Sequence, residues 1–414
     1  MRTPFERFDM AKAPVRTRWY LHPLTLLLSM PSVWAHRNKL TKIGMKGIKP
    51  PYVLLCNHNA FMDFKVATKA IFPYRANYVV AIDGFIGREW LLRQVGCICK
   101  RKFTNDVLLI RQLRRTIENG DIAVIYAEAR YSLCGTNAIL PESLGKICRL
   151  LGVPVVTLMC HGHHVNSPFW NLHDRGVAPT EAEMKLLFTA EEIRNTPVPE
   201  INARINEAYQ YDDFRWQKER GIKVKYSKRA EGLHKVLYQC PCCGKEYGMR
   251  SSGTQLSCSH CGKVWEMTEL GELQALDGKT EFSHIPDWYE WEREQVRAEV
   301  DAGTYDSGEL EVDVWTLPNA RKFLHLGFGK LRHNMDGFTV EGIDVDGDPF
   351  GNHWPVPSLY SCHIEYEYLG KYGDCVDLNT LEDTWYIYPK GKDFAVTKFA
   401  LATEELWKKH FGKE

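Results

Sequence analysis

The feature that most constrains the fold is an alternation of short apolar runs and helical stretches between residues 50 and 176. Apolar residues at helical spacing separate the runs, most clearly in 106–118. The alternation predicts an α/β domain whose mostly parallel sheet has helices on its faces. The expected buried strands are Tyr52–Cys56, Tyr78–Ala81, Ile122–Tyr126 and Val153–Leu158.

The rest of the chain changes its pattern twice. Residues 189–220 have helical spacing, and Thr189 with Glu192 predicts a capping box. After a cysteine-rich module at 238–268, alternation of period two at 309–314 predicts a half-buried strand. A small antiparallel sheet or barrel and a closing helix at 404–410 are expected to follow. The additional strand-like stretches are 338–340, 363–368, 384–388 and 395–399.

Length and composition exclude several classes of protein. At 414 residues, the chain is long enough for two or three domains of about 150 residues each. Its 44% hydrophobic and 25% charged residues fit neither a largely disordered chain nor a polytopic membrane protein. The thirteen cysteines do not indicate a disulfide scaffold, because four of them have metal-ligand spacing. We therefore expect a reducing, cytoplasmic compartment.

The first 60 residues are strongly basic. They contain ten Lys and Arg residues and only two acidic residues, Glu6 and Asp9, which gives this segment a net charge of +8. Residues 61–414 carry a net charge of −7. This suits an anionic surface, either a lipid headgroup layer or a phosphorylated substrate. The apolar run Trp19–Ala35 is shorter than the roughly 20 uninterrupted apolar residues of a spanning helix. It predicts peripheral attachment to the inner face of a membrane, with a signal peptide or a buried helical hairpin as alternatives.

His58 and Asp63 follow the first strand at an H-x4-D spacing, in a turn of the kind where α/β proteins bind ligands. Acyl transfer to an alcohol needs a base for the hydroxyl proton, and a neutral imidazole can act near physiological pH. A carboxylate on the other ring nitrogen fixes the tautomer and stabilises the imidazolium. His58 as base and Asp63 as its partner fit these roles.

Three further blocks accompany this motif. Glu128 and Arg130 follow the strand at 122–126, and Arg can hold a phosphate while a carboxylate accepts from a hydroxyl or from that Arg. Arg101 lies in a basic run, and the strand at 153–158 can line a pocket. The order and spacing of the four blocks, over residues 40–175, resemble the glycerolphosphate and lysophosphatidic acid acyltransferase family.

The resemblance implies transfer of an acyl group from acyl-CoA or acyl-carrier protein to the hydroxyl of 1-acylglycerol-3-phosphate, which makes phosphatidic acid in phospholipid synthesis. It implies His58 and Asp63 as catalytic residues, and Arg101, Glu128 and Arg130 as substrate-binding residues.

The block that contains Glu128 and Arg130, which is the third along the chain, departs from the F-P-E-G-T-R that is typical of the family. This chain has Tyr126-Ala127-Glu128-Ala129-Arg130, without the proline and glycine and with the arginine one place earlier. Two alternatives therefore stay open: another acceptor, such as glycerol-3-phosphate or a different lysophospholipid, or a non-catalytic lipid-binding or regulatory adaptor on the same fold.

Two C-x2-C pairs, each followed by a glycine and separated by fourteen residues, predict a zinc ribbon with the ligands Cys240, Cys243, Cys258 and Cys261. Four thiolates leave no open position on the metal, so a structural zinc is expected. Cys242 and His260 are the alternative ligands. Mixed charges around the pairs argue against nucleic-acid binding.

Two other runs superficially resemble metal sites. Cys160–His164, with His173 and Asp174 nearby, follows the last strand of the α/β pattern, and we interpret it as a polar loop beside the pocket. Asp344–Asp348 is the second run, but Pro349 stands where the glycine of a calcium loop belongs and no Glu closes the loop, so a hairpin turn explains it better.

Together these patterns predict five segments in order: a basic interfacial helical segment at 1–45, the acyltransferase α/β core at 46–180, a helical connector completing that domain at 181–235, the zinc ribbon at 236–270, and an antiparallel β-rich domain of unknown role at 271–414.

Overall fold

The computed structural model describes residues 6–104, 106–368, 370 and 373–413. The chain divides into two compact units. The N-terminal unit comprises Asp9–Lys100 and Asp106–Val224. The C-terminal unit comprises Met1–Phe8, Arg101–Asn105 and Lys225–Glu414.

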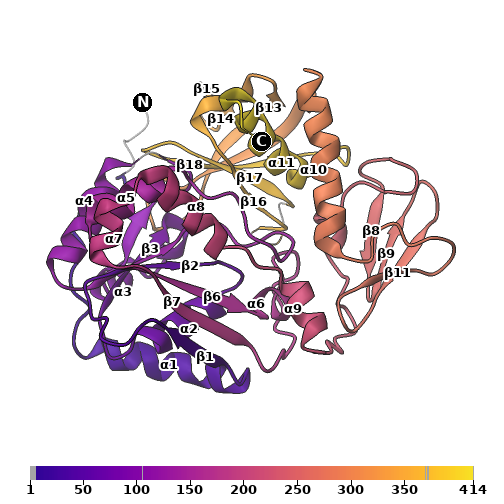
Figure 1. Cartoon of the computed structure of the whole chain (residues 1–414). Helices are drawn as coiled ribbons and strands as arrows, with labels where there is room; N and C mark the ends of the chain where they lie inside the picture. The colour runs from indigo at the N-terminus through magenta and orange to yellow at the C-terminus, as the bar shows by residue number, and fades with distance from the viewer. Residues whose placement is uncertain (1–5, 105, 369, 371–372, 414) are drawn as a thin grey trace. The chain divides into compact units, whose positions relative to one another are not determined.

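A seven-stranded sheet organises the N-terminal unit, in the order β1-β7-β6-β2-β5-β3-β4. Figure 1 labels β1, β7, β6, β2 and β3 of this sheet. All neighbouring pairs are parallel except β6 and β7. This arrangement confirms the predicted mostly parallel α/β sheet. The strands are β1 (Lys39–Ile43), β2 (Val53–Cys56), β3 (Ala76–Ala81), β4 (Ile98–Lys100), β5 (Ile122–Tyr126), β6 (Val155–His161) and β7 (Glu181–Phe188).

Local signals begin and end several helices of this unit. The side chain of Asp106 accepts from the backbone N–H of Leu108 at the start of α4, and Gly152 ends α5 in the left-handed region. The predicted capping box of Thr189 and Glu192 is present at α7. The helices are α1 (Leu21–Ala35), α2 (Met62–Ile71), α3 (Glu89–Gln94), α4 (Val107–Glu118), α5 (Ser143–Leu151), α6 (His163–Asn166), α7 (Ala190–Asn195), α8 (Val198–Ala208) and α9 (Asp213–Glu219), with a 3-10 turn η1 at Ile82–Phe85.

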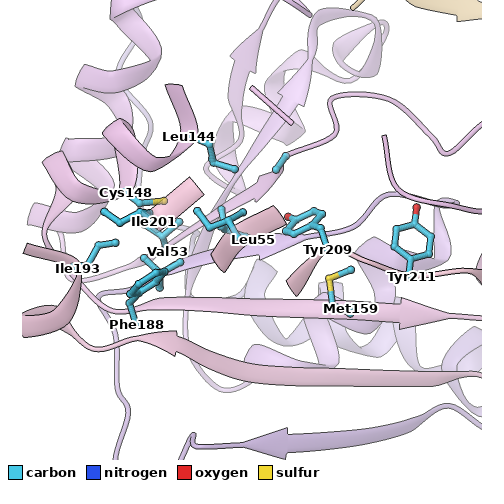
Figure 2. Close-up of a cluster of buried hydrophobic side chains, with 13 residues drawn as sticks. Val53, Leu55, Leu144, Cys148, Met159, Phe188, Ile193, Ile201, Tyr209 and Tyr211 are labelled. Carbon is cyan, nitrogen blue, oxygen red and sulfur yellow. The ribbon is translucent and has the colours of Figure 1, made fainter. Parts of the chain in front are cut away.

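One hydrophobic core lies between the sheet and the helices α5, α7 and α8 (Figure 2). Val53 and Leu55 of β2 and Phe188 of β7 are fully buried in it. Each such side chain contributes about 1.5–3 kcal/mol through removal from water. The packing fixes β2, and the residues that follow β2 carry the candidate site.

Two stretches of the N-terminal unit differ from their predicted structure. Lys39–Ile43, expected in a helical segment, forms β1, and Glu181–Phe188, expected in a helical connector, forms β7. β1 is mostly exposed at the sheet edge and therefore has no apolar alternation in its sequence. In β7, buried and half-buried positions alternate over its first residues, which is the half-buried strand pattern.

The C-terminal unit contains two antiparallel sheets, and the larger one confirms the antiparallel sheet predicted for the β-rich segment. The orders are β11-β10-β9-β8 and β15-β14-β13-β12-β18-β17-β16. The strands are β8 (Met249–Ser252), β9 (Gln255–Cys258), β10 (Val264–Met267), β11 (Leu273–Ala275), β12 (Leu310–Thr316), β13 (Leu324–Asn334), β14 (Gly337–Asp344), β15 (Pro349–Pro355), β16 (His363–Glu365), β17 (Cys375–Asn379) and β18 (Thr384–Pro389).

The helices of this unit differ from the prediction. The prediction of a strand at 395–399 is wrong, because the helix α11 (Val396–Phe411) begins there. This helix buries Val396, Phe399 and Ala400 at helical spacing. The helix α10 (Ile285–Asp301) was not predicted, and short 3-10 turns η2 (Leu233–Lys235) and η3 (Val356–Ser358) complete the unit.

The expected turn at 344–348 is confirmed, because it joins β14 to β15 and the carboxylate of Asp344 accepts from the backbone N–H groups of Asp346 and Asp348. Within the described residues, no helix of either unit combines the length and the apolar character that crossing a bilayer requires.

Candidate functional site

Three neighbouring parallel strands bring the candidate residues to one edge of the sheet. β2 lies between β5 and β6, and Cys56 at its end is in register with Tyr126 of β5 and Leu158 of β6. The residues immediately after these strands therefore share one edge, where α/β sheets place ligands. His58 follows β2, Glu128 follows β5, and His163 follows β6.

The His58–Asp63 pair is formed. Nδ1 of His58 lies 3.3 Å from Oδ2 of Asp63, and the side chain of His58 is 23% exposed whereas that of Asp63 is 1% exposed. Asp63 lies in the first turn of α2, where a carboxylate is favoured. Its Oδ2 also accepts from the backbone N–H groups of Asn59 (2.6 Å) and Ala60 (2.9 Å), which closes the turn around it.

A second imidazole contacts the same carboxylate. Nδ1 of His163 lies 2.5 Å from Oδ1 of Asp63, and His163 is fully buried. Burial alone would raise the pKa of Asp63, but hydrogen bonds from His163 and His58 outweigh it, and the pKa lies well below its ordinary value. Asp63 is therefore a carboxylate throughout the physiological range.

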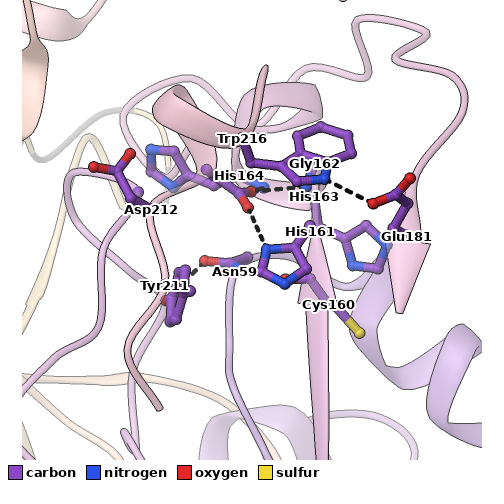
Figure 3. Close-up of polar contacts among 12 residues, drawn as sticks. Asn59, Cys160, His161, Gly162, His163, His164, Glu181, Tyr211, Asp212 and Trp216 are labelled. Atoms are coloured by element: carbon purple, nitrogen blue, oxygen red, sulfur yellow. Dashed lines mark hydrogen bonds and ion pairs between the residues drawn. The ribbon is translucent and has the colours of Figure 1, made fainter. Parts of the chain in front are cut away.

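The turn that carries His163 is itself fixed. Gly162 has φ 86°, and a Cβ there would lie 2.7 Å from the ring of Trp216. The carboxylate of Asp213 accepts from the backbone N–H groups of Gly162 (3.1 Å) and His164 (3.0 Å). Figure 3 shows this turn with its surroundings, including the bond from the Trp216 indole to Glu181.

Glu128 supports the backbone around His58. Its Oε2 accepts from the backbone N–H of His58 (2.9 Å), and its Oε1 accepts from that of Ala138 (3.1 Å) and from the Tyr211 hydroxyl (3.3 Å). Burial raises the pKa of Glu128 to about 8, against the lowering effect of the two backbone donors; the nearby charge of Asp63 adds to the rise.

The altered third block keeps the turn that a glycine would favour. Ala129 has φ 56° and donates from its N–H to the carbonyl of Tyr126 (3.1 Å). The rings of Tyr126 and Tyr131, which flank this turn, each lie with their centroids 4.3 Å from that of His58. Arg130 is 4% exposed.

Arg101 has its polar contacts within the C-terminal unit. It belongs to the C-terminal unit and is 2% exposed. Its guanidinium donates to the backbone carbonyls of Leu317 (3.1 Å) and Glu382 (2.9 Å) and to the Thr384 hydroxyl (2.7 Å).

The four predicted zinc ligands converge in the C-terminal unit. The Sγ atoms of Cys240 and Cys261 are 3.7 Å apart, and those of Cys243 and Cys258 are 3.8 Å apart. A tetrahedral zinc with Zn–S bonds of about 2.3 Å requires S–S distances of about 3.8 Å. The four-cysteine cluster could therefore bind zinc, which would act structurally because four thiolates fill its coordination sphere.

The two cysteine turns of this cluster match each other. The N–H of Gly244 donates to the carbonyl of Cys240 (2.8 Å), and that of Gly262 donates to the carbonyl of Cys258 (2.9 Å). Both glycines have positive φ, of 71° and 74°.

Asp63, Cys160 and His163 also place potential ligand atoms within 4.8 Å of one another. Both Asp63 oxygens already accept hydrogen bonds, and burial raises the pKa of the Cys160 thiol far above its ordinary value, which keeps it protonated. The arrangement fits a hydrogen-bond network better than a metal site.

Sequence reasoning placed His163 in a polar loop and missed its bond to Asp63. The available signal was its position directly after a strand of the α/β pattern, at the same sheet edge as His58.

No protein-family model matches the chain, and no curated protein matches its sequence. Among solved structures, the chain has a distant structural resemblance to the 1-acyl-sn-glycerophosphate (LPA) acyltransferase PlsC from Thermotoga maritima. The identity is 15%, the TM-score is 0.34, and the match covers 46% of this chain and 79% of that one.

Proposed function

We propose that the protein is an O-acyltransferase that moves a fatty acyl group from acyl-CoA or acyl-carrier protein to the hydroxyl of 1-acylglycerol-3-phosphate, forming phosphatidic acid. The observation that carries the proposal is the pairing of a partly exposed His58 with a buried, ionised Asp63 at the carboxyl ends of the central strands. A base that reaches the solvent-facing side of the site and a partner held out of water are what this chemistry needs.

The reaction follows from this geometry. Asp63 engages Nδ1 of His58, which leaves Nε2 to take the proton from the acceptor hydroxyl. The hydroxyl oxygen attacks the thioester carbonyl, an ester C–O bond forms, and the C–S bond breaks. The imidazolium returns its proton to the departing thiolate, so the products are the ester and a free thiol. Asp63 stabilises the imidazolium between these two steps.

Arg130 is the proposed partner of the acceptor phosphate, because it follows β5 at the same edge as His58. Glu128 stands beside it in the sequence, but both of its oxygens accept hydrogen bonds from protein donors that include the backbone of His58. Its proposed contribution is therefore to hold the loop of His58, and through it the acceptor site.

The surface of α1 supports attachment to a membrane. Leu21, Ser29 and Val33 form its buried stripe, whereas Leu27 is 66% and Leu28 is 69% exposed. Trp19, Trp34 and Leu24 are also exposed, within a segment of strongly positive charge. An apolar face beside basic residues is typical of a helix that lies in the interface of an anionic bilayer.

A second candidate, a non-catalytic lipid-binding adaptor, is favoured by the loss of proline and glycine from the third block. The positive φ at Ala129 weighs against it, because the turn is retained. Glycerol-3-phosphate and other lysophospholipids remain alternative acceptors.

The test is acyl transfer from a labelled acyl thioester to lysophosphatidic acid and to glycerol-3-phosphate. We expect wild type to transfer, and His58→Ala to be slower by about 10²- to 10⁴-fold with its fold intact. His410→Ala, which changes an exposed histidine of α11, is the matched control. Undiminished turnover in His58→Ala would remove His58 as base, and no transfer to any lysophospholipid by wild type would favour the adaptor.

A further inference from the structure

The carboxylate of Asp63 has a contact that the proposed chemistry does not use. The shorter of its two imidazole bonds is to His163 (2.5 Å), and the longer is to His58 (3.3 Å). His163 is fully buried, so it is not placed to meet a substrate. The two residues are one hundred positions apart in the chain, so no local backbone geometry imposes this contact.

We infer that His163 is a positioning residue, which donates from Nδ1 to Oδ1 of Asp63 and thereby holds Oδ2 toward His58. The inference rests on the proposed acyl transfer and deepens it. The terminal torsion of an Asp side chain is broad, so its partners decide where its oxygens point. Oδ2 has three donors, from His58, Asn59 and Ala60, whereas Oδ1 accepts from His163 among the described residues.

The surroundings of His163 fit a fixed donor. Asp213 holds the backbone on both sides of it through the N–H groups of Gly162 and His164. Its second ring nitrogen, Nε2, is buried and has no hydrogen-bond partner among the described residues. A neutral ring with its proton on Nδ1 places a bare nitrogen there, whereas the alternative tautomer would bury an unsatisfied N–H and turn a lone pair toward the carboxylate.

A donor in this position keeps Asp63 ionised and aligned while His58 gains and loses its proton. Without it, the buried oxygen Oδ1 has no partner and the carboxylate can turn away from His58. The effect should fall on kcat, because the step that needs Asp63 is proton transfer, and not on KM, because His163 is buried away from substrate.

Two substitutions separate donation from packing. His163→Asn places its amide N–H close to the position of Nδ1 and keeps a donor in a smaller side chain. His163→Phe keeps the volume of a ring and removes the donor. We expect kcat to fall by about 10- to 100-fold in His163→Phe with KM unchanged, and to recover most of that loss in His163→Asn. If His163→Phe is as active as His163→Asn or more active, packing explains the residue and the inference is overturned.

A second measurement is independent of turnover. With ¹⁵N-labelled histidine, the ring signals of His58 report whether Nδ1 carries a hydrogen-bonded proton. We expect this signal to be the same in wild type and His163→Asn and to be lost or shifted in His163→Phe, or in His163→Met if the Phe variant does not fold. A His58 signal that is unchanged in the variant without a donor overturns the inference, even where wild type transfers no acyl group and the proposed function itself fails.

Discussion

Glu128→Gln should change how the stability of the protein depends on pH. Burial raises the pKa of the folded Glu128 to about 8 from an ordinary value of 4.5. Since the folded state holds the proton more tightly than the unfolded state, the stability that this group contributes is fully present below the unfolded pKa. It is lost as the pH rises through the folded pKa. The contribution of Glu128 to stability therefore decreases between about pH 4.5 and about pH 8.

The magnitude follows from the linkage relation. Each pH unit inside this range changes the free energy of unfolding by about 1.4 kcal/mol for one proton. Between about pH 5 and about pH 7, the stability of wild type relative to Glu128→Gln should fall by about 2–3 kcal/mol. The variant also starts with a penalty, because one Gln oxygen cannot accept from the N–H groups of both His58 and Ala138. An unsatisfied buried N–H costs about 1–3 kcal/mol.

Urea denaturation at several pH values tests this prediction, with hydrogen exchange of peptides from β2 and β5 as the probe of the N-terminal unit. Glu207→Gln, on the exposed side of α8, is the matched control and should show no such relative change. A difference between wild type and Glu128→Gln that stays flat from about pH 5 to about pH 7 would mean that Glu128 ionises normally in the folded protein, and the burial argument would be refuted.

Three further predictions concern the zinc cluster, the third block and α1. The purified protein should contain one zinc per chain, and Cys258→Ser should lose the metal together with the exchange protection of β8–β10; a stably folded, metal-free wild type would contradict this. Ala129→Gly should change the free energy of unfolding by less than about 1 kcal/mol, because relief of the positive φ offsets the entropic cost of glycine, and a larger loss in a denaturation series would show that the turn is not left-handed. Replacing Leu27 and Leu28 by Ser should weaken binding to anionic vesicles by about 2–4 kcal/mol in a sedimentation assay, whereas unchanged binding would place the membrane contact elsewhere.

The parts of the site that sequence predicted are those that local pattern determines. His58 and Asp63 are five positions apart, and a strand followed by a helix start suffices to bring them together. That the residues after β2 and β5 share one sheet edge was also predictable, since the parallel strands of an α/β sheet end at the same edge. The cysteine pairs were predictable because their spacing and glycines specify the turns directly.

The remaining features depend on long-range packing, which periodicity does not contain. The contact of His163 with Asp63 requires β6 to lie beside β2, and the sequence does not specify that neighbour. Arg101 stands in a basic run that looks like a substrate site, yet its guanidinium satisfies carbonyls from residues far along the chain. The edge strand β1 has so little buried surface that no apolar pattern marks it.

Two of the buried carboxyl groups at this sheet edge, those of Asp63 and Glu128, have opposite pKa shifts, and the difference fits the roles proposed for them. Asp63 receives two imidazole donors as well as two backbone N–H groups, and its pKa falls. Glu128 receives no imidazole donor in the described structure, feels the charge of Asp63, and has its pKa raised to about 8. Near neutral pH the charge therefore resides on the carboxylate that contacts the ring of His58. Divergent pKa values in neighbouring groups are how one site separates a charged partner from a neutral support. If His163 were absent, Asp63 would lose a donor and part of this separation, so His163 and Glu128 act on the same quantity, the placement of one negative charge beside His58.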